Sequence, residues 1–182
     1  MVQTFILISL ISSVPARAVG SEYETDILQA AHTGDAQSQF ALALLYEYGG
    51  ETIVRDPEQS VAWLEKAGKE AVAGACLYLG LKYEHGNTVQ QDFSKAVCWY
   101  SCAAQQDWPV AQFFLARLYE LGKGVSPSPI VALAWLGLAA EHGYPGSEEE
   151  FSRLQQATGF KDTRQLQVKQ EMLLRGQRTP CN

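Results

Sequence analysis

The chain has 182 residues, of which 47% are hydrophobic, a content too high for an intrinsically disordered protein and sufficient for one domain of ordinary size. Its formal net charge is −6, and no stretch concentrates Lys and Arg. A surface that follows nucleic-acid phosphates is therefore excluded, and we expect no nucleic-acid partner.

Residues 1–18 have the pattern of a signal peptide. An apolar run from Phe5 to Leu10 is followed by Ala16-Arg17-Ala18, the small-x-small pattern of a cleavage site. The run is too short to span a bilayer. No Lys or Arg precedes it, which leaves a buried or amphipathic first helix as the alternative. We expect cleavage after residue 18, no membrane span, and a periplasmic or secreted protein.

Residues 19–35 end like half of a repeat. The segment 29–35 (QAAHTGD) matches the later segment 138–144 (LAAEHGY), which closes a helix. We expect residues 19–35 to form an N-terminal cap.

Residues 36–145 contain three copies of a repeat. Its most visible feature is a tryptophan at a spacing of 36 residues: Trp63, Trp99 and Trp135. A fixed period of this size is typical of repeat arrays, in which each unit buries its apolar face on a neighbour. The sequence therefore predicts an all-α fold, an α-solenoid of antiparallel helix hairpins.

The first helix of each repeat, helix A, carries an apolar stripe at helical spacing. Aligned on a tyrosine, each copy has a leucine four residues earlier, a small residue three earlier and a glycine three later, as in Leu42, Ala43, Tyr46 and Gly49; Leu79, Gly80, Tyr83 and Gly86; Leu115, Ala116, Tyr119 and Gly122. Glycine at the last position suits the left-handed turn that ends a helix.

The second helix, helix B, begins at a predicted cap and carries the tryptophan. Asp56-Pro57 and Ser128-Pro129 place a hydrogen-bond acceptor before a first-turn proline, and Asp92 serves in the middle copy. We expect the tryptophans to be buried. Trp99 should contribute more stability than Trp135, because the central hairpin has neighbours on both sides.

Residues 146–182 depart from the repeat. An acidic helix start at residues 147–150, a turn at Thr158-Gly159 and a charged helix over about 162–175 predict C-terminal capping helices and a tail.

Four cysteines are present: Cys76, Cys98, Cys102 and Cys181. The spacing of Cys98 and Cys102 differs from the C-x2-C of zinc and redox sites. We favour small packing residues with at most one bridge, but four cysteines allow three connectivities, and the sequence does not decide whether disulfides form or which.

The repeat closely resembles the Sel1-like repeat of the tetratricopeptide superfamily. The middle copy matches best, through Ala75, Leu79-Gly80, Tyr83, Gly86, Val89, Asp92, Lys95-Ala96, Trp99 and Ala103-Ala104. The resemblance implies an adaptor that binds proteins, as its members do, some of them exported from bacteria. In its cysteine-rich branch the position of Cys76 pairs with residue 68. Residue 68 is glycine here, so that pairing does not carry over.

The candidate binding residues lie on helix A, off the buried stripe, where stacked hairpins present a concave face. They are Tyr48, Tyr78, Lys82, His85, Phe114 and Arg117. Aromatic residues and arginine are typical of interface hot spots. The alternative is packing between successive hairpins.

No catalytic motif, cofactor motif or set of metal ligands occurs in the sequence, and we expect neither an enzyme nor a metal or cofactor site. The predicted function is an exported, monomeric scaffold for another protein or peptide. The alternative is a peptidoglycan-associated module or a hydrolase-like enzyme on the same fold.

Overall fold

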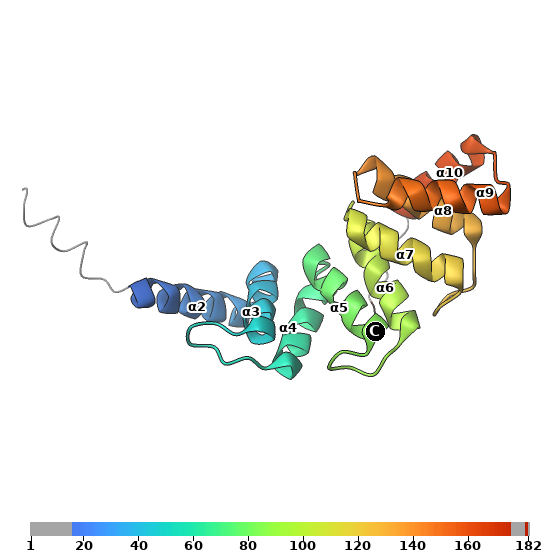
Figure 1. The fold of residues 1–182 in the computed structure, drawn as a ribbon. Helices are drawn as coiled ribbons and strands as arrows, with labels where there is room; N and C mark the ends of the chain where they lie inside the picture. The colour runs from blue at the N-terminus through green and yellow to red at the C-terminus, as the bar shows by residue number, and fades with distance from the viewer. Residues whose placement is uncertain (1–15, 176–180, 182) are drawn as a thin grey trace, which may run out of the picture. The chain divides into compact units, whose positions relative to one another are not determined.

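The computed structural model describes residues 16–175 and residue 181, and all regular secondary structure in this part is helical (Figure 1). The helices are α2 (Ala16–His32), α3 (Ala36–Tyr48), α4 (Pro57–Lys69), α5 (Ala73–His85), α6 (Phe93–Ala104), α7 (Pro109–Leu121), α8 (Pro129–Glu141), α9 (Ser147–Thr158) and α10 (Thr163–Arg175). Most of the expected signal peptide, residues 1–15, lies outside the described residues. The chain divides between Lys66 and Ala67 into two compact units.

The first unit contains α2, α3 and most of α4. Helix α2 packs against α3 and buries Ile27 and Ala31. Trp63 of α4 is buried, and its ring meets the edge of His32 with 5.0 Å between centroids. The Nζ atom of Lys66 lies 3.4 Å from the centroid of the same indole, a cation–π contact.

Glu24 of α2 fixes the loop between α3 and α4. Its carboxylate accepts hydrogen bonds from the backbone N–H groups of Glu51 (2.5 Å), Thr52 (2.8 Å) and Ile53 (3.2 Å), and from the Thr52 hydroxyl. These bonds lower the pKa of Glu24, the Thr52 hydroxyl having the largest effect, while burial opposes the shift. The helix before the first repeat is thus joined to that repeat by a buried charge.

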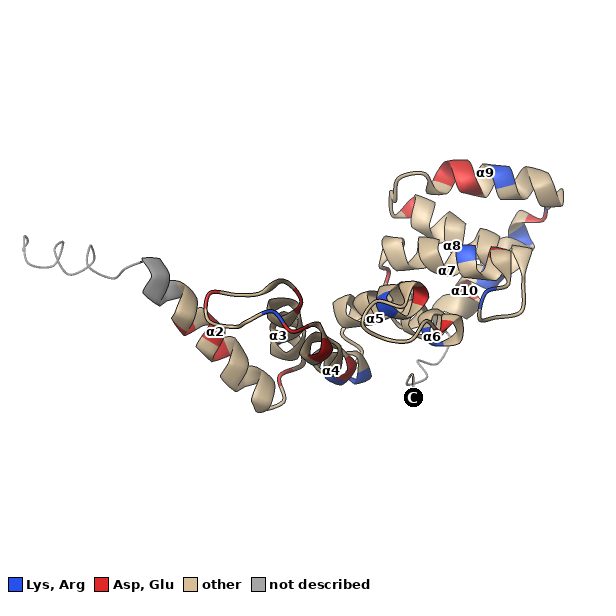
Figure 2. Cartoon of the chain, turned by 60° about the horizontal axis from the view of Figure 1, so that its bottom comes forward, with Lys and Arg blue, Asp and Glu red and all other residues tan. Residues whose placement is uncertain are grey.

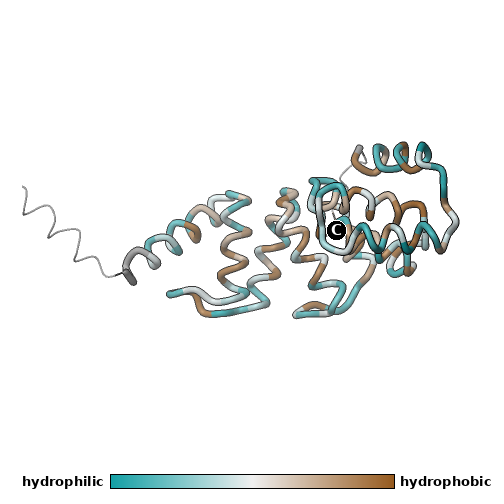
Figure 3. Tube along the Cα trace, turned by 45° about the horizontal axis from the view of Figure 1, so that its top comes forward, coloured by the Kyte–Doolittle hydropathy of each residue, from teal (hydrophilic) through white to brown (hydrophobic). Residues whose placement is uncertain are grey.

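The second unit is built by successive packing of neighbouring helices. Helix α5 packs on α6, α6 on α7, α7 on α8, and α8 on both α9 and α10. Gly86 and Gly122 end α5 and α7 in the left-handed conformation, as predicted. Figure 3 shows that hydrophobic residues recur along the helices.

Three predicted helix starts can be compared with the structure. Asp56 accepts from Gln59 N (3.0 Å) and Asp92 from Lys95 N (3.0 Å), so both cap their helices. Ser128 and Pro129 occupy the predicted N-cap and first helical positions of α8, but the Ser128 side chain makes no capping hydrogen bond.

Helix α8 is the centre of the second unit. Its buried residues point in every direction around the helix: Val131, Ala132, Leu133, Ala134, Trp135, Leu136, Leu138 and Ala139. This pattern is expected of a helix covered on several sides, here by α7, α9 and α10. Trp135 is therefore at least as buried as Trp99, and the structure gives no reason to rank Trp99 above it.

In the first and third repeats, a buried glutamine at the start of helix A binds a carbonyl eight residues earlier, at the end of the preceding helix. Gln39 donates to Ala31 O (3.4 Å) and Gln112 to Ala104 O (3.1 Å). In the middle repeat this position is Cys76, whose sulfur lies 3.8 Å from Gly68 O. Two of the three repeats thus satisfy a helix-end carbonyl with a glutamine side chain, while Cys76 has no hydrogen to donate to Gly68 O.

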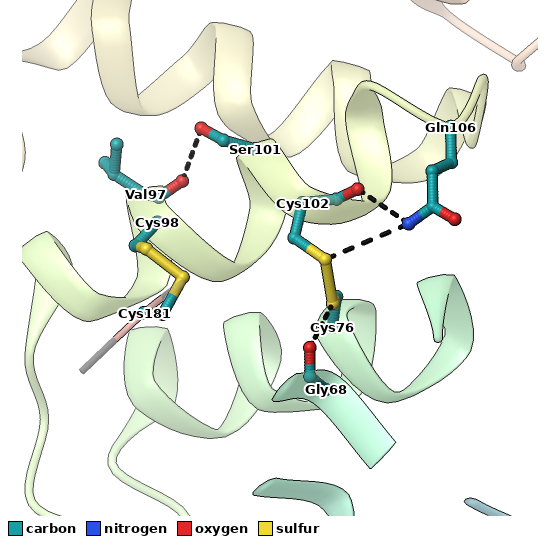
Figure 4. Close-up of a disulfide and its surroundings, with 8 residues drawn as sticks. All are labelled: Gly68, Cys76, Val97, Cys98, Ser101, Cys102, Gln106 and Cys181. Carbon is teal, nitrogen blue, oxygen red and sulfur yellow. Dashed lines mark hydrogen bonds between the residues drawn. A yellow bond between two sulfur atoms is a disulfide. The ribbon is translucent and has the colours of Figure 1, made fainter. Parts of the chain in front are cut away.

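All four cysteines are paired. Cys76 of α5 bonds to Cys102 of α6, and Cys98 of α6 bonds to Cys181 (Figure 4). The expectation of at most one bridge was wrong, because Cys98 and Cys102, one turn apart on α6, are bonded to different partners. Gly68 leaves no space for a side chain, since a Cβ atom there would lie 2.8 Å from the Trp99 ring.

Candidate interaction surface

Most predicted binding residues lie on two neighbouring A helices of the second unit. Tyr78 and His85 belong to α5, and Phe114 and Arg117 belong to α7. We call these four residues the α5–α7 surface. Tyr48 is 68% exposed at the end of α3 and belongs to the first unit.

Tyr100 of α6 lies beneath this surface. Its buried ring stacks on Phe114 of α7, with 5.6 Å between centroids and an interplanar angle of 14°. The ring also lies against Gly80 of α5, because a Cβ atom on Gly80 would be 2.5 Å from it. One aromatic ring of helix B therefore fixes the positions of both A helices.

The hydroxyl of Tyr100 donates a 2.6 Å hydrogen bond to the Glu84 carboxylate. Burial is the main reason that the pKa of Tyr100 rises far above its ordinary value, and the bond to Glu84 and its negative charge act in the same direction. The positive charge of Arg117 opposes them, so Arg117 is close enough to act on this pair. The phenol stays protonated and Glu84 stays its acceptor.

Phe114 departs from the expectation that it lies outside the core. Its side chain is half-buried, and the stack on Tyr100 makes it part of the packing between successive hairpins. It also meets Phe113 edge-on, with 6.0 Å between centroids. Its exposed part remains available at the surface.

Lys82 departs further, because it is only 5% exposed. Its position, one residue before the aligned tyrosine, is Leu45 in the first repeat and Leu118 in the third, and Leu118 is buried. Lys82 occupies an apolar position of the repeat, so it was wrong to place it beside Arg117 on the surface. The leucines at the equivalent positions of the other two repeats could have indicated this from the sequence.

Arg117 is exposed, and among the described residues its guanidinium makes no hydrogen bond or ion pair. His85 is also exposed, and its Nδ1 lies 2.9 Å from Leu81 O, so Nε2 faces outward from that bond. Tyr78 is half-buried. The α5–α7 surface thus combines aromatic area with an arginine whose donors are available.

The surface is bordered by an ion-pair network that sequence reasoning missed. Arg153 of α9 contacts Glu120 of α7 and Glu150 of α9, each at 2.6 Å. Figure 2 shows the acidic first turn of α9. A glutamate follows the aligned tyrosine in every repeat, at Glu47, Glu84 and Glu120, and this regularity was the available signal. A shallow hollow of about 460 Å³ beside Arg153 is lined by α9 alone and is not part of the α5–α7 surface.

Within the described residues, no group of three or more His, Cys, Asp and Glu side chains is placed to hold a metal ion. None of the helices in this part of the chain is both long and apolar enough to cross a membrane.

The helices and their packing define an all-α protein of stacked helix hairpins, a helical-repeat protein. Residues 36–71, 73–108 and 109–144 each match the model of the Sel1 repeat, and the chain belongs to the Sel1 repeat family. Members of this family generally mediate protein interactions, and the fold is typically a non-enzymatic scaffold.

Solved structures similar to the chain include the following two. A Sel1 repeat protein from Oxalobacter formigenes is 30% identical, with a TM-score of 0.67, and the match covers 71% of this chain and 96% of that one. A protective antigen present in uropathogenic Escherichia coli strains, which displays an SLR fold, is 34% identical with a TM-score of 0.65, covering 70% of this chain and 27% of the antigen. No curated protein matches the chain.

Proposed function

We propose that the chain is an exported adaptor that binds a protein or peptide partner on the α5–α7 surface. The observation that carries this proposal is Arg117, an exposed arginine one helical turn after the half-buried ring of Phe114 on α7, with the half-buried ring of Tyr78 on α5. Arginine and tyrosine are enriched among residues that dominate interface energies. Because these side chains stand on packed helices, little backbone freedom is lost when a partner binds.

Two observations support export. All four cysteines are in disulfides, which persist in oxidising compartments and are rare in the cytosol. The first 18 residues have the pattern of a signal peptide. The mature protein purified from the cell envelope or medium should start at Val19 by intact mass. A purified envelope protein that starts at Met1 would contradict cleavage.

Partner binding is tested by capture from envelope extract with the mature wild-type protein and two charge-reversal variants. Arg117→Glu changes the proposed surface, and Lys161→Glu makes the same charge change at an exposed residue outside the α5–α7 surface. A partner identified by mass spectrometry should be lost with Arg117→Glu, by tenfold or more in affinity, and retained with Lys161→Glu. Equal capture by both variants would place the site elsewhere.

We propose that the adaptor acts as a monomer, which light scattering of the purified protein would test. The same preparation should not turn over peptidoglycan or a lactam substrate. Turnover would favour the hydrolase-like alternative.

A further inference from the structure

Both α10 and Cys181 connect the C-terminal segment to the rest of the second unit. Helix α10 packs against α8 (Figure 1), and Cys181 is bonded to Cys98 of α6 (Figure 4). This disulfide closes a loop between residues 83 apart in sequence. All of these groups belong to the second unit.

Few of the described side chains of α10 are buried. Leu166 is the only residue buried among those of α10 whose side chains are described. Val168 and Met172 are 51% and 62% exposed. Asp162 caps the helix by accepting from Gln165 N at 2.9 Å, which orders its first turn but does not attach it to the unit. A helix of 13 residues with so little burial is marginal by itself.

The surface beneath α10 is suited to receive a helix. Gln170 of α10 donates to the backbone carbonyl of Ala134 at 3.3 Å. Gly137 lies under the same side chain, and a Cβ atom on it would be 2.7 Å from Gln170 Nε2. Small residues on α8 thus permit close approach of α10, and the rest of α8 is apolar. If α10 left, this strip would be an exposed apolar groove.

We propose that the Cys98–Cys181 disulfide is a redox latch that holds α10 over α8. Reduction frees α10 and opens a groove on α8 for a partner helix of the same chemistry as α10: amphipathic, with a leucine and a glutamine at i and i+4. This goes beyond adaptor binding on the α5–α7 surface, because it assigns a second surface and its control.

The reaction is thiol–disulfide exchange with a dithiol reductant. Its first thiolate attacks Cys181 Sγ, the bond to Cys98 breaks, and Cys98 leaves as a thiolate that takes up a proton. The second thiol of the reductant then attacks the mixed disulfide and releases Cys181 as a thiol. The two cysteines gain two electrons and two protons, and the reductant becomes a disulfide.

The other disulfide is partly shielded from this reaction, because one of its two cysteines is fully buried. Cys76 is 0% exposed, whereas its partner Cys102 is half-buried, as are both Cys98 and Cys181. Cys76–Cys102 also joins α5 to α6, which pack along each other without the bond. Reduction should therefore open the Cys98–Cys181 bond first, because neither of its cysteines is fully buried and no direct packing of two helices holds its ends together.

The latch is tested with the full mature chain as Cys98→Ser/Cys181→Ser, with Cys76→Ser/Cys102→Ser as the matched control. Hydrogen exchange should show at least a tenfold loss of protection in α10 for the first variant, while α5 to α7 keep theirs. Unchanged protection of α10 would overturn the latch. A labelled synthetic peptide of residues 162–175 should bind the first variant and not the oxidised wild type. Failure to bind would overturn the groove.

A second measurement does not depend on the folding of either variant. The wild-type protein is exposed to increasing dithiol, and free thiols are alkylated and located by mass spectrometry. Cys98 and Cys181 should be labelled before Cys76 and Cys102, together with the loss of protection in α10. Simultaneous labelling of all four cysteines would contradict the proposal.

Discussion

The ring of Tyr100 lies against the backbone of Gly80, at 2.5 Å from where a Cβ atom would stand. At the same two positions the first repeat has Ala43 and Leu64, and the third has Ala116 and Leu136. The middle repeat thus combines the larger residue on helix B, Tyr100, with the smaller residue on helix A, Gly80.

Gly80→Ala should therefore destabilise the protein, although alanine favours helices more than glycine does. The added methyl group overlaps the Tyr100 ring, and overpacking of this kind costs about 1–3 kcal/mol. Urea denaturation of the disulfide-intact protein measures the change. The chain supplies a compensating variant: in Tyr100→Leu, which reproduces the pair of the other repeats, Gly80→Ala should be neutral or stabilising. If the changes in unfolding free energy for Gly80→Ala and Tyr100→Leu simply added, the contact between residue 80 and the Tyr100 ring would not be the cause of the destabilisation.

The repeat and its helices could be predicted because they depend on local patterns. The spacing of the tryptophans, the leucine stripe and the glycines at Gly86 and Gly122 each act within one hairpin, and the Sel1 match agrees with them. The aspartate caps were readable for the same reason, since Asp56 and Asp92 bind amides three residues away.

The details of the surface depend on contacts that local patterns do not contain. Phe114 was assigned to the surface because its stack on Tyr100, 14 residues earlier on the preceding helix, is a contact that the pattern within one helix does not contain. Lys82 was assigned there because it lies off the stripe that contains Leu79 and Tyr83, although the other repeats have leucine at its position. The disulfide partners depend on where the chain after α10 runs, which no periodicity specifies.

The tryptophans of the second unit should both be essential for stability. Trp99 and Trp135 are buried, and truncating a buried large aromatic residue costs about 3–5 kcal/mol. We expect Trp99→Ala and Trp135→Ala to have similar effects, because α8 is covered by α9 and α10 as well as α7. Chemical denaturation of both variants tests this. A loss below about 1 kcal/mol for either would mean that its indole is exposed in solution.

Glu24→Gln should weaken the first unit in a pH-dependent way. The amide leaves buried N–H donors poorly paired, at a cost of about 1–3 kcal/mol at neutral pH. The pKa of Glu24 is lowered on folding, so its stabilisation is fully present above its ordinary value of 4.5 and is lost as the pH falls through the folded pKa.

The difference in unfolding free energy between wild type and Glu24→Gln should therefore shrink as the pH falls below 4.5. Glu22→Gln, an exposed residue of the same helix, is the control and should change little at any pH. A difference that stays constant down to pH 2 would show that the charge of Glu24 is not involved.

Binding and packing on the α5–α7 surface should separate by residue. Phe114→Ala removes the stack on Tyr100 and should reduce stability by about 1–3 kcal/mol, because an aromatic pair adds to the apolar area that a half-buried ring covers. Arg117→Ala should change stability by less than about 0.5 kcal/mol, as surface substitutions do. It should weaken the affinity for the captured partner at least tenfold.

Phe114→Leu keeps apolar contact with Tyr100 and gives a variant that still folds. Thermal melting and partner affinity must be measured on the same preparations. If Arg117→Ala binds like wild type while Phe114→Leu does not, aromatic contact alone would carry the interaction and the role proposed for the guanidinium would be wrong.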